Sequence, residues 1–213
     1  APTIRRGALG CATRMAEARN EPAAFTTVPL ERGVTLHHRR SDDFKTELVR
    51  VFFRAPLGRM TAERQLFAAL LSRATGRLPD RRVLTAHLES LYGAGYGVAI
   101  QRMAGRHVLA LRASTVAGRF LPGRPRNLSH VLELVRDALQ GPPTRDGRID
   151  SEVFEEERRN LLRDYRARMN NKGSYAAQRL LEEMFAPHPL GRPETGTEDE
   201  IHAATPGATL AEG

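Results

Sequence analysis

The sequence predicts an α+β fold, a two-layer sandwich in which helices cover a mainly antiparallel sheet. Apolar residues alternate in short segments, two of these segments form a hairpin, and helical segments come in pairs between the strands. Strands joined by hairpins, with helix pairs between them, favour an α+β layer over alternating βαβ units. The length of 213 residues, with 40% hydrophobic residues, suits one domain with a sizeable core.

The first strands are expected after a leader. Residues 1–27 mix Pro, Gly, Ala and Arg without a sustained period, so we expect a partly disordered leader before a domain over 28–213. A short strand is expected over 34–38 and a second one over 48–54. In the second strand, alternate apolar residues share one face: Val49, Val51 and Phe53.

Two helices on one apolar layer are expected next. Between Thr61 and Gly76, apolar side chains recur at helical spacing, and Thr61 is available as the N-cap. The pattern repeats over 81–91 and ends at 92–95, where two glycines relax the backbone.

A β-hairpin and further helices complete the expected elements. Alternating segments at 96–100 and 108–111 predict two strands, with Ala104-Gly105 as the turn between them. Helical spacing and capping residues predict the remaining helices over 128–139, from Asp150 or Ser151 onward, and over 175–185.

Four segments carry a resemblance to a known family. In this order along the chain, they resemble the N-terminal domain of pitrilysin/insulinase-type zinc peptidases, the group that includes mitochondrial processing peptidase. The resemblance covers roughly residues 30–212 and is greatest to a bacterial subgroup of zinc-free, inactive paralogues. It implies the metallohydrolase fold of that family, with a second homologous domain expected to be absent from these 213 residues. The segments are Ser41 to Thr46, Leu88 to Ala94, Phe154 to Arg159, and Ser174 to Ala177 followed by Glu183 to Phe185.

The resemblance also implies that the catalytic site is degenerate. Active members carry H-x-x-E-H on a helix, where two histidines bind zinc and the glutamate activates water. The matching positions here hold Gln65, Ala68 and Ala69, and the distal ligand position holds Asp164. A catalytic zinc site needs about three protein ligands, so neither zinc nor another cofactor is expected in this chain.

Other titratable residues are interpreted as structural. His37 and His38 are neighbours in an expected strand, so they point to opposite faces and would not readily chelate one ion. His107 is isolated among polar neighbours. The acidic run Glu155 to Glu157 is interpreted as surface charge near a helix N-terminus rather than as an acid–base pair.

A peptide-binding strand is the remaining site hypothesis. In active family members a substrate peptide adds to an exposed strand edge near the metal. The resemblance places the matching strand at Gly95, Tyr96, Gly97 and Val98. A plain helix-to-strand turn is the alternative interpretation of the glycines there.

Charge and composition limit the remaining functions. The net charge of +8 comes from arginine, since Lys45 and Lys172 are the only lysines. No nucleic-acid motif is present and the aromatic residues do not interleave with the basic clusters, so nucleic acid is not the expected partner. No apolar run approaches the roughly 20 residues that cross a bilayer. The single cysteine, Cys11, fits a reducing cytoplasm.

Three functions therefore stay open. The first is a non-catalytic peptidase homologue that pairs with an active sister subunit, or with itself, and holds or encloses peptide. The second is an active zinc metallopeptidase with an unrecognised site. The third is a basic structural or nucleic-acid-associated protein.

Overall fold

The chain divides into two compact units in the computed structural model. The model describes residues 24–58, 60–103 and 105–212. The first unit spans Ala1–Phe44 and the second spans Lys45–Gly213. Most of the expected leader, residues 1–23, lies outside the described residues. The single domain expected over 28–213 stays a prediction.

The described part of the first unit is a small antiparallel hairpin. Strand β1 (Thr26–Pro29) pairs with β2 (Thr35–His38), and the 3-10 turn η2 (Glu31–Gly33) lies between them. The sequence predicted β2 but not β1, although every residue of both strands is exposed. The Thr27 hydroxyl lies 3.0 Å from Nδ1 of His37.

A three-stranded antiparallel sheet forms the centre of the second unit. Its order is β3-β5-β4, so β5 is the middle strand. The predicted hairpin is confirmed, with Gly105 in its turn. In the register, Leu111 lies opposite Val51 of β3 and Val98 of β4. The strands are β3 (Thr46–Pro56), β4 (Gly95–Met103) and β5 (Arg106–Val116).

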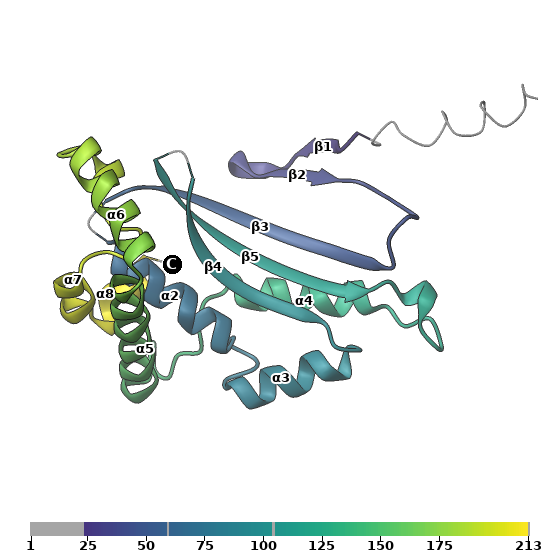
Figure 1. The fold of residues 1–213 in the computed structure, drawn as a ribbon. Coiled ribbons are helices and arrows are strands. Elements are labelled where there is room, and N and C mark those ends of the chain that lie inside the picture. Colours follow the sequence, from purple (N-terminus) through teal and green to yellow (C-terminus); the bar gives the residue numbers. More distant parts are fainter. Residues whose placement is uncertain (1–23, 59, 104, 213) are drawn as a thin grey trace, which may run out of the picture. The chain divides into compact units, whose positions relative to one another are not determined.

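Three helices lie on one side of this sheet, which confirms the predicted α+β layering (Figure 1). Thr61 was expected to be an N-cap, and that expectation is wrong. It is the first helical residue after the cap residue Met60, and its hydroxyl donates to the Gly58 carbonyl at 2.9 Å. The helices are α2 (Thr61–Arg73), α3 (Arg81–Ser90) and α4 (Asn127–Ala138).

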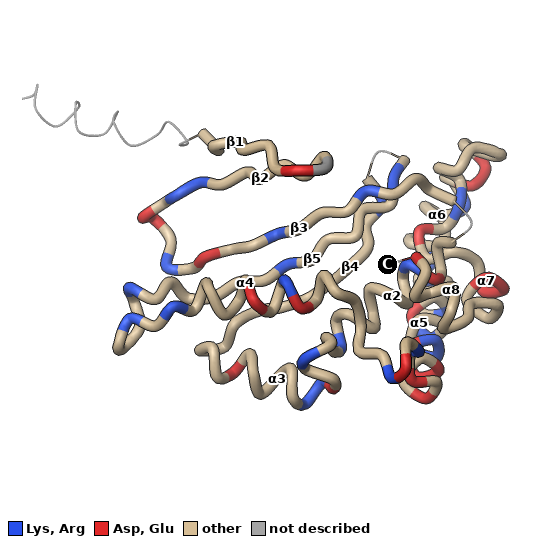
Figure 2. The backbone as a smooth tube through the Cα atoms, turned by 180° about the vertical axis from the view of Figure 1, so that it is seen from behind, with Lys and Arg blue, Asp and Glu red and all other residues tan. Residues whose placement is uncertain are grey.

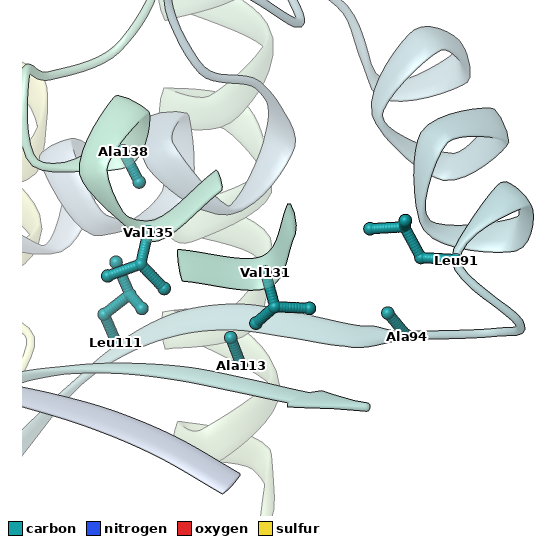
Figure 3. Close-up of a cluster of buried hydrophobic side chains, with 7 residues drawn as sticks. All are labelled: Leu91, Ala94, Leu111, Ala113, Val131, Val135 and Ala138. Carbon is teal, nitrogen blue, oxygen red and sulfur yellow. The ribbon is translucent and has the colours of Figure 1, made fainter. Parts of the chain in front are cut away.

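The main core lies between the sheet and α4. Figure 3 shows the apolar side chains of α4 above those of β5, with a contribution from the segment that joins α3 to β4. Val49, Val51 and Val98 are partly buried against this cluster, so the alternation expected in β3 does face the helices. The buried members are Leu91, Ala94, Leu111, Ala113, Val131, Val135 and Ala138.

Three of the four remaining α-helices of the described residues pack against α2, and the fourth packs against the long helix of this group. Asp150 caps the long helix as predicted, since its carboxylate accepts from the Glu152 amide at 2.8 Å. Phe154 lies at the centre of this packing with Leu66 and Leu70 of α2. The 3-10 turn η3 (Gly118–Phe120) lies between β5 and α4, and η4 (Pro189–Gly191) lies between the second and third helices of this group. The helices are α5 (Ser151–Asn170), α6 (Lys172–Phe185), α7 (Glu198–Ala203) and α8 (Pro206–Ala211).

Candidate functional site

Helix α2 presents the positions that correspond to the degenerate metal motif. Ala68 is buried and Ala69 is half-buried, so neither offers a ligand atom or a base. Gln65 is half-buried and donates from Nε2 to the Glu194 carbonyl at 3.1 Å. Its amide therefore fixes the segment before α7 to α2.

Asp164 lies on α5, a helix that packs against α2, and its side chain is exposed. A carboxylate of α5 that does meet α2 is that of Glu157, which is buried. Arg73 of α2 approaches Glu157 at 3.0 Å and Glu156 at 2.7 Å, and Asn160 donates to Glu157 at 3.3 Å. The interpretation of Glu157 as a surface charge is wrong, because its partner comes from another helix.

The described residues contain no group of three or more His, Cys, Asp or Glu side chains that could hold a metal ion. A catalytic zinc site uses about three protein ligands and an open position for water. The residues at the motif positions of α2 therefore do not fit zinc, and no hydrolytic step can be derived from them.

Strand β4 carries the four residues of the peptide hypothesis and is an edge strand of the described sheet. Helix α2 contacts this edge through Ser72. The Ser72 hydroxyl donates to the Val98 carbonyl at 2.7 Å and accepts from the Val98 amide at 3.0 Å. The Tyr96 hydroxyl donates to the Leu71 carbonyl at 3.0 Å. Ser72 thus occupies both backbone groups of Val98, a contact that the sequence did not predict.

Glu194 binds the same edge of β4 at Arg102, four residues after Val98. Its carboxylate accepts from the Arg102 amide at 2.9 Å, while the Arg102 guanidinium donates to the carbonyls of Leu190 and Arg192. Alternate residues of a strand direct their backbone groups to the same side, so those of Tyr96 and Ile100 point outward as those of Val98 do. The backbone groups of Tyr96 and Ile100 are therefore available for pairing with a peptide. Those of Val98 and the amide of Arg102 are already bonded to Ser72 and Glu194.

A cavity of about 170 Å³ lies on the covered side of the sheet, and His107 is part of its lining. His107 is 1% exposed, so it is a buried residue, with Arg64 and Glu212 in the same lining. Neither ring nitrogen has a hydrogen-bond partner among the described residues. Burial lowers the pKa of His107, and the charge of Arg64 lowers it further, although Glu194 opposes both. Arg64 also lines the cavity and is paired with Glu212 at 2.7 Å.

Comparisons with known proteins agree with this fold. No family model matches the sequence. The chain is 25% identical over 174 residues to a Bacillus subtilis (strain 168) protein named probable inactive metalloprotease YmfF, covering 81% of this chain and 41% of that protein. A conserved protein from Enterococcus faecalis V583 has a TM-score of 0.82 and 22% identity, with 89% and 45% of the two chains covered.

A solved structure also shares the fold. A peptidase M16 inactive domain from Pseudomonas fluorescens has a TM-score of 0.69 and 18% identity, with 88% of this chain and 42% of that chain covered. The expected resemblance to pitrilysin/insulinase-type peptidases is therefore confirmed: the chain is similar to a protein named as a probable inactive metalloprotease and shares its fold with a peptidase M16 inactive domain. It spans less than half the length of each of these relatives. None of the described helices is long and apolar enough to cross a membrane.

Proposed function

We propose that this peptidase homologue is a non-catalytic subunit that holds extended peptide at the edge of β4 and pairs with an active sister subunit. The observation that supports peptide holding is the position of β4 at the edge of the described sheet, next to the motif positions on α2. A peptide that adds to a strand edge gains main-chain hydrogen bonds without any catalytic group. The single cysteine, Cys11, supports a cytoplasmic location.

The proposed pairing with a sister subunit is supported by the lack of a set of metal ligands among the described residues. A chain that cannot assemble three metal ligands needs another subunit if the peptide is to be cleaved. The alternative of a peptidase with an unrecognised site would need such ligands elsewhere, and the described residues hold no group of them. The observations therefore favour a supporting role over catalysis.

Replacing Ser72 with alanine is expected to strengthen peptide binding at this edge. The change frees the Val98 amide and carbonyl, which Ser72 occupies in the resting structure. One additional main-chain hydrogen bond is worth about 1 kcal/mol, or about a fivefold gain in affinity. The measurement is photo-crosslinking of an extended, benzophenone-bearing peptide to the 213-residue chain, titrated to give a dissociation constant.

Two controls separate edge pairing from other binding. Ser90→Ala removes a hydroxyl that bonds the His87 carbonyl on α3, and it should leave crosslinking unchanged. A peptide N-methylated at alternate residues cannot form the ladder and should crosslink weakly. Equal crosslinking of the methylated and plain peptides, with no effect of Ser72→Ala, would remove the support for peptide pairing at β4.

A further inference from the structure

Arginine and apolar side chains share the side of the sheet opposite to α2 and α4. Side chains alternate between the two faces along each strand, and Arg50 lies opposite Arg112 in the register. Even-numbered residues of β3 and β5 therefore share this face, while Val51 and Leu111 share the covered one. We define the open sheet face by six of its residues: Leu48, Arg50, Phe52, Arg54, Arg106 and Arg112.

The charges of the open sheet face are all of one sign. Figure 2 shows basic positions along β3 and β5, and the alternation places four arginines and no acidic residue of the three strands on this face. All four arginines are exposed, and none forms an ion pair or a side-chain hydrogen bond with a described residue. Elsewhere in the same unit, arginines such as Arg73 and Arg166 pair with glutamates.

The placement of Arg50 and Arg112 is unfavourable for the isolated chain. Like charges directly opposite one another in a sheet are destabilising. A ligand with negative charge would remove this cost and would gain two attractive contacts. The pair therefore indicates that the face meets an acidic partner, rather than serving only to solvate the surface.

Apolar side chains are interleaved with these arginines. Leu48 is 50% exposed and Phe52 is 54% exposed, and they alternate with Arg50 and Arg54 along β3. The sequence-based expectation that aromatic residues avoid the basic clusters is wrong at this strand. The face can therefore bury apolar side chains of a partner between its arginines, whereas a site for a small anion needs only the charges.

We propose that the open sheet face binds an acidic segment of another polypeptide in which carboxylates alternate with apolar side chains. Single-stranded nucleic acid usually stacks successive bases on several aromatic rings, whereas this face has one, Phe52. Aliphatic groups such as Leu48 instead suit apolar side chains of a peptide. The inference rests on the proposed function only in taking a polypeptide as the occupant, because this face is distinct from the β4 edge.

The test measures binding of a fluorescent peptide of alternating Glu and Leu to the 213-residue chain, at low salt and at 0.5 M salt. The double variant Arg50→Glu/Arg112→Glu is expected to weaken binding about tenfold at low salt, because two attractions become repulsions. High salt should weaken binding to the unmodified chain and reduce the difference between the two. A Lys-Leu peptide of equal length should bind poorly.

A matched variant controls for net charge. Arg82→Glu/Arg159→Glu makes the same change of charge at two exposed residues of α3 and α5, away from the sheet, and should retain full binding. The milder variant Arg54→Gln/Arg106→Gln removes charge without reversing it. It should weaken binding about threefold, which keeps the test usable if the reversal unfolds the chain.

Three results would overturn the inference. The first is equal binding by the unmodified chain and both open-face variants, and the second is an equal loss in the control variant. The third is tighter binding of a single-stranded oligonucleotide than of the acidic peptide through the same arginines. If peptide binding responds to Ser72→Ala but not to the arginine changes, the proposed function stands and this inference fails.

Discussion

Replacing Arg73 with methionine is expected to lower the free energy of unfolding by about 3 kcal/mol, because removing one member of a buried ion pair leaves the other charge uncompensated. That other charge is Glu157, whose side chain is 7% exposed. Arg81, at 3.9 Å and largely exposed, and Asn160 are the remaining partners, and they cannot replace the lost contact in full. Urea unfolding followed by circular dichroism measures the change.

The double variant Arg73→Met/Glu157→Met separates the ion pair from ordinary packing. Apolar replacements of both members leave no buried charge, so the double variant should recover most of the lost stability. A single variant as stable as the unmodified chain would mean that Glu157 keeps enough contact with water or with its other partners to compensate for the loss of Arg73. The link between α2 and α5 would then not depend on this pair.

Replacing Phe154 with alanine is expected to cost about 4 kcal/mol of unfolding free energy, the usual range for truncating a buried aromatic side chain. Phe154 is 1% exposed and packs between Leu66 and Leu70 of α2 and Ala204 after α7. The loss combines the transfer of the ring to water with the cavity that remains. Thermal and urea unfolding of the same samples measure it.

Met184→Ala serves as the comparison for Phe154→Ala. Met184 is 64% exposed on α6, so its truncation should change the unfolding free energy by less than about 0.5 kcal/mol. Comparable losses in the two variants would contradict the assignment of Phe154 to the centre of the helical packing around α2.

The sequence predicted those parts of the fold that depend on local signals. The β4–β5 hairpin follows from alternation on both sides of a glycine turn, and the start of α5 follows from the capping carboxylate of Asp150. The short helices α7 and α8 were not predicted, because six residues give too few turns for a periodic pattern. Thr197 and Glu200 form a capping box, a signal in the sequence that could have predicted the start of α7.

The site contacts were less predictable, because each joins residues far apart in the sequence. Ser72 reaches Val98 on another element, and Arg73 reaches Glu157 across 84 positions. Hydrophobic periodicity reports which face of a helix is buried, but not which polar residue of another element meets it. The motif positions on α2 were predictable only through the family resemblance, because nothing in the local pattern of α2 marks them.

Zinc content tests most directly the proposal that this chain is non-catalytic. The chain would be purified without chelator, dialysed against zinc, then against metal-free buffer, and analysed for its elements. With Gln65, Ala68 and Ala69 on α2 and an exposed Asp164 on α5, we expect near-zero zinc per chain. One zinc per chain that survives the second dialysis would contradict this expectation and would make Asp164 and the histidines the first residues to mutate.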